Sequence, residues 1–318
     1  MANISLSVII PSKNNKYHVS DIIKRIAAEL PGEEVEFIVI DMNSSDDSVI
    51  CALEEIKNNH LRGCVIQSGG GSISSALNTG IYKSDGKYIT FVYPSRMYKN
   101  YIADYLKTAD KTAAEFVFAV PSGVGGLPVE DNVLRRNGSD KIDASALMTE
   151  LIYSRVFFDF TAVMLKREYL LRNHIKFYED CHFGYAEAFI YNVLLHQPQI
   201  ACADILLERH TENAAVKENP PENVNCYERI DAMLKVYDTL KLQRRDNLKL
   251  IELFEYQKLP SVVISVVDML RKQNFSFQAI RKSLKQKGYS QLLRVSHCTE
   301  PELKKKILMC KFAPWFYQ

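Results

Sequence analysis

The sequence predicts an α/β fold in which a mainly parallel sheet is flanked by helices and followed by a helical C-terminal domain. Over the first third of the 318 residues, short β-branched runs alternate with segments of helical periodicity. Strands that are joined through single helices form βαβ units, which give parallel sheets with helices on both faces. Beyond residue 223 the patterns are almost wholly helical.

The alternating region contains the predicted strands and helices in strict succession. The strands are Leu6–Ile10, Val35–Ile40, Cys64–Gln67, Tyr88–Val92 and Phe116–Val120. The helices are Val19–Leu30, Asp47–Asn58, Ser74–Lys83 and Tyr101–Lys111. Ligands of such sheets bind at the carboxyl ends of the strands, so the polar residues that follow each strand are the candidates for a site.

The middle of the chain is less regular. A turn at Pro121–Gly126 and a polar loop at Pro128–Asp143 precede an apolar, β-rich run at Phe157–Leu165. Further on, the patterns predict helices at Arg167–Asn173 and Phe183–Leu195, a strand at Ile200–Leu207 and a linker at Ala214–Asn223. We therefore expect two domains, residues 1–215 and 216–318, with breaks in the second at Pro260, Gly288 and Pro301.

Composition and charge narrow the class of protein. With 47% hydrophobic and 25% charged residues the chain is typical of a soluble globular protein, and no apolar run approaches the roughly 20 residues that span a bilayer. The seven cysteines are scattered and never form a CxxC pair, which argues against a disulfide framework or a zinc site and favours the reducing cytoplasm. The region Arg271–Gln318 holds eleven basic residues against two acids.

Polar segments follow the first two predicted strands, at Pro11–Asn15 (PSKNN) and Asp41–Ser48 (DMNSSDDS). Taken singly, each is also what a helix N-cap requires. Two further segments lie downstream, Gly71–Ile81 (GSISSALNTGI) and Gly86–Val92 (GKYITFV). In this order and spacing, the four segments resemble glycosyltransferase family 2 over about residues 5–215. The resemblance implies a GT-A-type fold and transfer of a sugar from a nucleotide donor with inversion.

The resemblance also implies a nucleotide site. In the family, the first strand end and the Asp turn hold the base and ribose, a task that suits a carboxylate because it accepts hydrogen bonds from the base or a ribose hydroxyl. Carried over by position, the nucleotide-binding residues are Pro11, Ser12, Asn14, Asp41, Asn78, Ser95, Arg96 and His210.

Departures from the family pattern fall on the phosphate side of this site. The Asp-x-Asp that holds a divalent metal in the family falls on Tyr93-Pro94-Ser95, and the family's arginine near the diphosphate is Leu77. Neither tyrosine nor serine is the hard carboxylate ligand that Mg²⁺ or Mn²⁺ prefers. The sequence therefore predicts no metal ligands and weak, metal-independent nucleotide binding, with Arg96 on the phosphates and Lys99 and His210 assisting.

The family's catalytic Glu-Asp pair is likewise missing from the expected stretch, His182–Phe189. Glu187 is the nearest carboxylate and the first candidate for the general base, and Asp180 and Glu179 are the second choices. A solvated helix position is the alternative role for Glu187. The missing acids leave two hypotheses: a glycosyltransferase that moves a sugar, from UDP by preference, to a surface glycan, or a degenerate relative that acts as a scaffold or as a glycan- or nucleotide-binding partner.

The partners follow from these readings. The donor is a nucleotide sugar and the acceptor a glycan or a lipid-linked molecule, whereas nothing in the tail resembles a nucleic-acid-binding fold. The basic, aromatic-rich end Glu302–Gln318 predicts contact with an anionic membrane surface or with another copy in a homo-oligomer. The expected location is the cytoplasm, at the inner face of the membrane.

Overall fold

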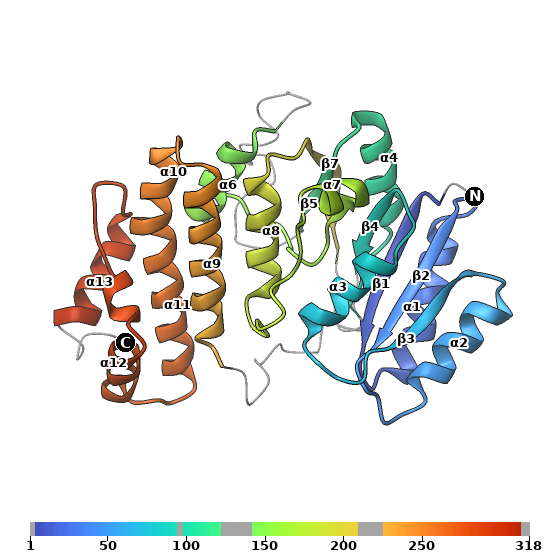
Figure 1. The fold of residues 1–318 in the computed structure, drawn as a ribbon, viewed down its shortest axis with the longest axis horizontal. Helices are drawn as coiled ribbons and strands as arrows, with labels where there is room; N and C mark the ends of the chain where they lie inside the picture. Colours follow the sequence, from blue (N-terminus) through green and yellow to red (C-terminus); the bar gives the residue numbers. More distant parts are fainter. Residues whose placement is uncertain (1–3, 94–97, 122–141, 209–224, 313–318) are drawn as a thin grey trace. The chain divides into compact units, whose positions relative to one another are not determined.

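The computed structural model describes residues 4–93, 98–121, 142–208 and 225–312, and the chain divides into two compact units (Figure 1). The first unit comprises residues 1–144, 157–180 and 196–221. The second comprises residues 145–156, 181–195 and 222–318, so it also takes two short segments from the middle of the chain. The predicted domain boundary between residues 215 and 216 lies outside the described residues.

The first unit is built on one seven-stranded sheet with the strand order β3-β2-β1-β4-β6-β5-β7. Its strands are β1 (Leu6–Ser12), β2 (Val35–Asp41), β3 (Arg62–Gln67), β4 (Tyr88–Phe91), β5 (Phe116–Pro121), β6 (Met164–Lys166) and β7 (Ile200–Leu207). The pairs β2–β3, β1–β2, β1–β4 and β5–β7 are parallel, and only β6 runs antiparallel to its neighbours, β4 and β5. The prediction of a mainly parallel sheet is confirmed.

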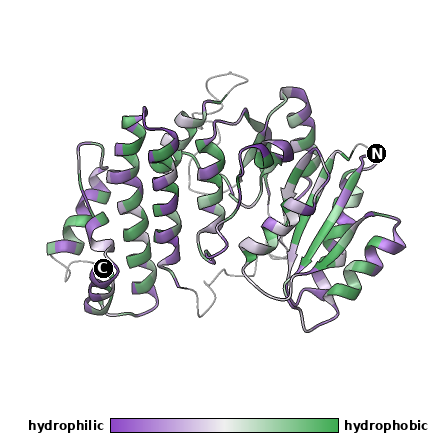
Figure 2. Cartoon of the chain, in the orientation of Figure 1, coloured by the Kyte–Doolittle hydropathy of each residue, from purple (hydrophilic) through white to green (hydrophobic). Residues whose placement is uncertain are grey.

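Strand β1 lies in the interior of the sheet, between β2 and β4, and all seven of its residues are buried. A strand that is covered on both faces needs apolar side chains in both directions, and the continuous run in place of an alternating one meets that need. Figure 2 shows the strands of this unit as predominantly hydrophobic. The polar end of β1, Ser12, stands beside Asp41 at the end of β2 in the sheet register.

Helices flank this sheet: α1 (Lys16–Glu29), α2 (Ser48–Asn58), α3 (Ile73–Lys83), α4 (Ile102–Thr112) and α7 (Arg167–Arg172). Two glycines permit the close approach of segments to β1. A Cβ on Gly80 of α3 would lie 2.4 Å from the side chain of Ile9, and a Cβ on Gly86 would lie 2.6 Å from the backbone nitrogen of Ser7. Both distances are shorter than any ordinary contact, so any larger residue would push α3 or the start of β4 away from β1.

The apolar run predicted at Phe157–Leu165 forms a strand only at its end, in β6. The reason is a local turn at Asp159. One carboxylate oxygen of Asp159 accepts hydrogen bonds from the backbone N–H and the hydroxyl of Thr161, at 2.8 and 2.6 Å. Such bonds within a short segment compete with the hydrogen bonds of a sheet. Phe158 instead packs against Phe118 with the two rings tilted by 31° and their centroids 4.4 Å apart.

The second unit is helical. Its elements are α6 (Ala144–Ile152), α8 (Tyr185–Leu195), α9 (Glu228–Gln243), α10 (Leu248–Leu253), the π-helix η3 (Phe254–Lys258), α11 (Leu259–Lys272), α12 (Phe277–Gln286), the 3₁₀ helix η4 (Tyr289–Leu292) and α13 (Pro301–Phe312). Every residue of α8 from Glu187 onward is buried, so this helix lies inside the unit. Among the described residues, no helix is both long and apolar enough to cross a membrane.

Pro260 does not break the helical path as predicted, because the chain continues from α10 through η3 into α11. Proline lacks the N–H that an α-helix would donate to the carbonyl four residues earlier, here that of Tyr256. That carbonyl instead accepts a hydrogen bond from the Thr299 hydroxyl at 2.8 Å. The π-helical turn before the proline accommodates the change in hydrogen bonding. The other two predicted breaks are confirmed, since α12 ends before Gly288 and α13 begins at Pro301.

Candidate functional site

The loops that follow β1 and β2 are hydrogen-bonded to one another and form the rim of the candidate site. The backbone N–H of Asn14 donates to the Ser44 hydroxyl at 2.9 Å, and the backbone N–H of Ser45 donates to the Asn14 side-chain carbonyl at 2.9 Å. Asn14 and Asn43 have φ angles of 54° and 62°, a left-handed conformation that asparagine tolerates better than most residues. These hydrogen bonds therefore join the two loops into one rim.

Two buried oxygen atoms at the base of this rim have no hydrogen-bond partner among the described residues. They are the hydroxyl of Ser12, which is 1% exposed, and Oδ1 of Asp41, which is 2% exposed. The other carboxylate oxygen of Asp41 accepts from the backbone N–H of Ser44 at 3.2 Å. Buried polar atoms are nearly always hydrogen-bonded, and an unsatisfied one costs about 1–3 kcal/mol. Two such atoms on adjacent strand ends are what a polar ligand would satisfy.

A third strand end adjoins the same point. Ser68, directly after β3, donates both its backbone N–H and its hydroxyl to the carbonyl of Asp41, at 2.9 and 3.0 Å. The chain then turns through Gly70 and Gly71, whose φ angles of 102° and 110° suit glycine alone, before Ser72 caps α3. The ends of β1, β2 and β3 are thus held together around Asp41, as their parallel arrangement predicts.

Asn78 is predicted to bind nucleotide, but its side-chain amide is hydrogen-bonded to other residues of the protein. Its Nδ2 donates to the carbonyl of Phe177 at 3.0 Å, and its Oδ1 accepts from the N–H of Phe177 at 2.8 Å. Nδ2 also lies 3.2 Å from a carboxylate oxygen of Glu179. A nucleotide contact by Asn78 would have to replace these bonds. In this structure the residue ties α3 to the segment that precedes Asp180.

The segment before Asp180 has a second tie to α3. The hydroxyl of Ser72 donates to the carbonyl of Glu179 at 2.7 Å. Ser72 at the N-terminus of α3 and Asn78 in its second turn therefore anchor residues 177–179. The side chains of Glu179 and Asp180 remain exposed. Of the predicted candidates for a general base, Asp180 is thus an exposed carboxylate on an anchored segment of the first unit.

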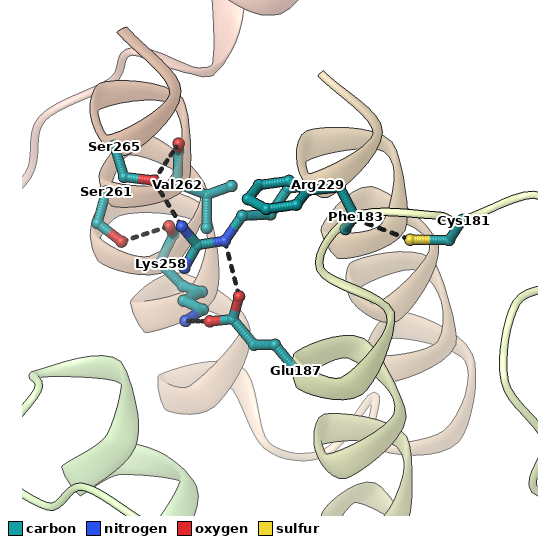
Figure 3. A network of polar contacts seen from close by, with 8 residues as sticks. All are labelled: Cys181, Phe183, Glu187, Arg229, Lys258, Ser261, Val262 and Ser265. Atoms are coloured by element: carbon teal, nitrogen blue, oxygen red, sulfur yellow. Dashed lines mark hydrogen bonds and ion pairs between the residues drawn. The ribbon is translucent and has the colours of Figure 1, made fainter. Parts of the chain in front are cut away.

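Glu187 has a different environment, inside the second unit (Figure 3). One of its carboxylate oxygens lies 2.9 Å from Nε of Arg229 on α9, and the other lies 2.6 Å from Nζ of Lys258 at the end of the π-helix. Arg229 also donates to the hydroxyl of Ser265 at 2.8 Å, and Lys258 lies over the ring of Tyr191, 4.6 Å from its centroid. The alternative role of a solvated helix residue is therefore wrong, because only 8% of Glu187 is exposed.

The two cations keep the carboxyl group of Glu187 ionised. Burial alone would raise the pKa of its carboxyl group, but Lys258 and Arg229 outweigh burial and lower that pKa to about 2. The same pairing raises the pKa of Lys258, against the effect of its own burial. A carboxylate that is held in two ion pairs and has so low a pKa is a weak proton acceptor at neutral pH. The geometry therefore favours Asp180 over Glu187 for that task.

The phosphate side of the predicted site is only partly within the described residues. Tyr93, at the first Asp-x-Asp position, is buried, whereas Ser95, Arg96 and His210 lie outside the described residues. Lys99 is described, and its ammonium lies 3.6 Å from a carboxylate oxygen of Glu208. Within the described ranges, no group of three or more His, Cys, Asp or Glu side chains is placed to hold a metal ion. A tyrosine at the first ligand position does not fit Mg²⁺ or Mn²⁺, which prefer carboxylate oxygens.

Sequence reasoning missed Arg229 and Lys258. They lie 42 and 71 residues from Glu187, and no local pattern links a cation to a carboxylate over such a distance. The one local signal was the charge itself: Glu187 and Lys258 stand within apolar helical segments, where an ion needs a partner.

Comparisons with known proteins agree with this architecture. Residues 7–94 match the model of the glycosyl transferase family 2. The structure of TarS from S. aureus, residues 1–349, superposes with a TM-score of 0.71 at 16% identity, covering 97% of this chain and 87% of that one. The mannosyltransferase PcManGT from Pyrobaculum calidifontis, in complex with GDP-Man and Mn²⁺, gives a TM-score of 0.56 at 14% identity, covering 98% and 85%. At these identities the structural likeness shows the fold.

A sequence relative is the minor teichoic acid biosynthesis protein GgaB of Bacillus subtilis (strain 168), which is 25% identical over 206 residues. The match covers 61% of this chain but only 21% of that protein, so this chain corresponds to about a fifth of the length of its relative. The family match falls on the strand ends that hold Ser12 and Asp41, and the fold is that of TarS. Residues 7–94 therefore resemble glycosyltransferase family 2, and the chain has the GT-A fold.

Proposed function

We propose that the protein transfers a sugar from a UDP donor to a surface-glycan acceptor, with inversion at the anomeric carbon. The observation that supports a nucleotide donor is the pair of buried oxygens of Ser12 and Asp41 below the rim, which have no hydrogen-bond partner among the described residues. A carboxylate oxygen accepts from the ring N–H of uracil or guanine, whereas the matching nitrogen of cytosine is itself an acceptor. Solved complexes of TarS with UDP-GlcNAc and with UDP favour uracil among these.

The proposed chemistry is a single displacement. The acceptor hydroxyl loses its proton to a carboxylate, its oxygen attacks the anomeric carbon, and the bond from that carbon to the diphosphate breaks with its electron pair. The base is Asp180 or Glu187, and the buried ion pairs of Glu187 favour Asp180. Arg96, with Lys99 and His210, would stabilise the departing diphosphate in place of a metal.

The acceptor and the location are proposed from the relatives. A relative in minor teichoic acid biosynthesis supports a glycan or lipid-linked acceptor of the cell surface. We place the protein in the cytoplasm at the inner face of the membrane, with its basic C-terminal helices against the membrane or a second copy.

Calorimetric titration with UDP, GDP and CDP, each with and without Mn²⁺, tests the donor site. We expect UDP to bind best and Mn²⁺ to change its affinity less than tenfold. Equal or absent binding of all three nucleotides would refute the proposed site.

A second function is favoured by the environment of Glu187. If the carboxylate closest to the family's catalytic position is held in a structural ion-pair network, the protein could bind the nucleotide sugar as a scaffold without turning it over. Release of UDP from a labelled UDP-sugar, measured with and without a glycan acceptor, separates the two functions. Nucleotide binding without any UDP release would establish the scaffold.

A further inference from the structure

Helix α13 presents apolar side chains on two opposite faces. Leu303, Ile307 and Cys310 are buried within the second unit. On the outward side, Leu308 is 43% exposed and Phe312 is 71% exposed. These two line a hollow on the surface together with Pro301, Lys304, Lys305 and Met309. A helix that only packs on its own domain needs one apolar face, so the second face calls for a partner.

The border of this outward face is basic. Lys304 and Lys305 are exposed, and no ion pair of either is found among the described residues, whereas the neighbouring Lys306 lies 2.9 Å from Asp268 on α11. The second unit as a whole holds 19 lysines and arginines against 12 acids, a net charge of +7, and the first unit holds 21 against 26, a net charge of −5. The exposed lysines and the net positive charge of the unit make the outward face of α13 complementary to an anionic partner.

We infer that the outward face of α13 docks on an anionic lipid bilayer. Lysine ammoniums beside exposed Leu308 and Phe312 match a surface in which phosphates lie directly above acyl chains. In a symmetric dimer, a second copy would bring another unit of +7 to the same face. A soluble polyanion would leave the two apolar side chains exposed to water. This inference deepens the proposed location of the protein and requires no transfer activity.

The test is co-sedimentation of the full chain with phosphatidylcholine vesicles, with and without phosphatidylglycerol. We expect binding only to the anionic vesicles. Replacing the two lysines in the double variant Lys304→Gln/Lys305→Gln should lower the partition coefficient about 30-fold, since each basic residue near an anionic surface contributes about a factor of five. The double variant Leu308→Ser/Phe312→Ser should lower it about tenfold or more, because two apolar side chains no longer enter the interface.

Matched controls use side chains of the same kind elsewhere. Lys107→Gln on α4 removes an exposed lysine of the first unit, and Leu242→Ser on α9 removes a leucine that is 67% exposed. Neither should change the partition, and thermal unfolding should show that all variants are folded. Equal binding of the wild type to both kinds of vesicle, or unchanged partition of both α13 variants, would overturn the inference.

Sedimentation velocity without lipid examines the competing occupant. If the wild type is a dimer and Leu308→Ser/Phe312→Ser is a monomer, the outward face of α13 contacts a second copy, and this result would also overturn the inference. Titration of the wild type with UDP tests the donor site separately. Absent UDP binding with intact binding to anionic vesicles contradicts the proposed function alone, and UDP binding without binding to anionic vesicles contradicts this inference alone. The α13 variants should bind UDP like the wild type.

Discussion

Replacing Glu187 by Gln should destabilise the second unit substantially at neutral pH. The substitution keeps the shape of the side chain but removes the charge that pairs with Arg229 and Lys258, and Lys258 is only 6% exposed. The pKa of Glu187 falls from its ordinary 4.5 to about 2 in the folded protein. At 1.36 kcal/mol for each pH unit, this difference corresponds to about 3 kcal/mol of folding free energy, in the range found when one partner of a buried ion pair is removed.

The pH dependence of this effect has a definite sign. Because folding lowers the pKa of Glu187, its contribution to stability is fully present above about pH 4.5 and is lost as the pH falls toward 2. The wild type and Glu187→Gln should therefore differ by about 3 kcal/mol at pH 7 and converge at low pH. Urea unfolding followed by far-ultraviolet circular dichroism at several pH values measures both curves.

A matched control is Glu302→Gln, which removes an exposed carboxylate from α13 of the same unit and should change the unfolding free energy by no more than about 0.5 kcal/mol. If Glu187→Gln is as stable as this control at pH 7, the ion pairs contribute nothing and the reasoning is refuted. The double variant Glu187→Gln/Lys258→Met should regain part of the loss, because it removes the buried ammonium that Glu187→Gln leaves without its carboxylate.

Three further predictions concern the donor site and the chemistry. Asp41→Ala should weaken UDP binding by roughly 1–3 kcal/mol in calorimetry, and unchanged affinity would remove Asp41 from the site. Asp180→Asn should lower turnover about 10²–10⁴-fold with little change in UDP affinity, whereas folded Glu187→Gln should keep it; the opposite pattern would make Glu187 the base. Arg96→Ala should weaken UDP binding about tenfold whether or not Mn²⁺ is present, and a tenfold tightening of wild-type binding by Mn²⁺ would contradict metal independence.

The fold of the first unit could be predicted because its elements follow local rules. Alternating β-branched runs and amphipathic helices leave few arrangements other than a parallel sheet, and the five strands predicted before residue 121 are all present. The predicted break at Pro260 is wrong because a residue far away in the sequence supplies a hydrogen bond to the helix. Thr299 satisfies the carbonyl that Pro260 leaves without a donor, so the helix continues, and no pattern around the proline reveals that partner.

In the candidate site, too, some residues could be predicted from local patterns and others depend on distant partners. Ser12 and Asp41 could be found from the sequence because parallel strands end at one edge of the sheet. The role of Asn78 could not, since its partners at Phe177 and Glu179 lie about 100 residues away and come from an irregular segment. The same holds for Glu187, whose position in the sequence suggested a base and whose surroundings make it one member of a buried ion-pair network.

The residues that reveal the family are, for a large part, residues that build the fold. Gly80 and Gly86 allow α3 and the start of β4 to approach β1, and Asn14, Ser44 and Ser45 join two loops whose geometry also shapes the rim of the proposed nucleotide site. A change at these positions would disturb folding and ligand binding together. The metal-binding and catalytic pairs of the family have no such double task, because neither pair is required to close the sheet. Resemblance to the family therefore supports nucleotide binding more strongly than it supports transfer. It follows that UDP binding and sugar release have to be measured separately, and that the first can hold where the second fails.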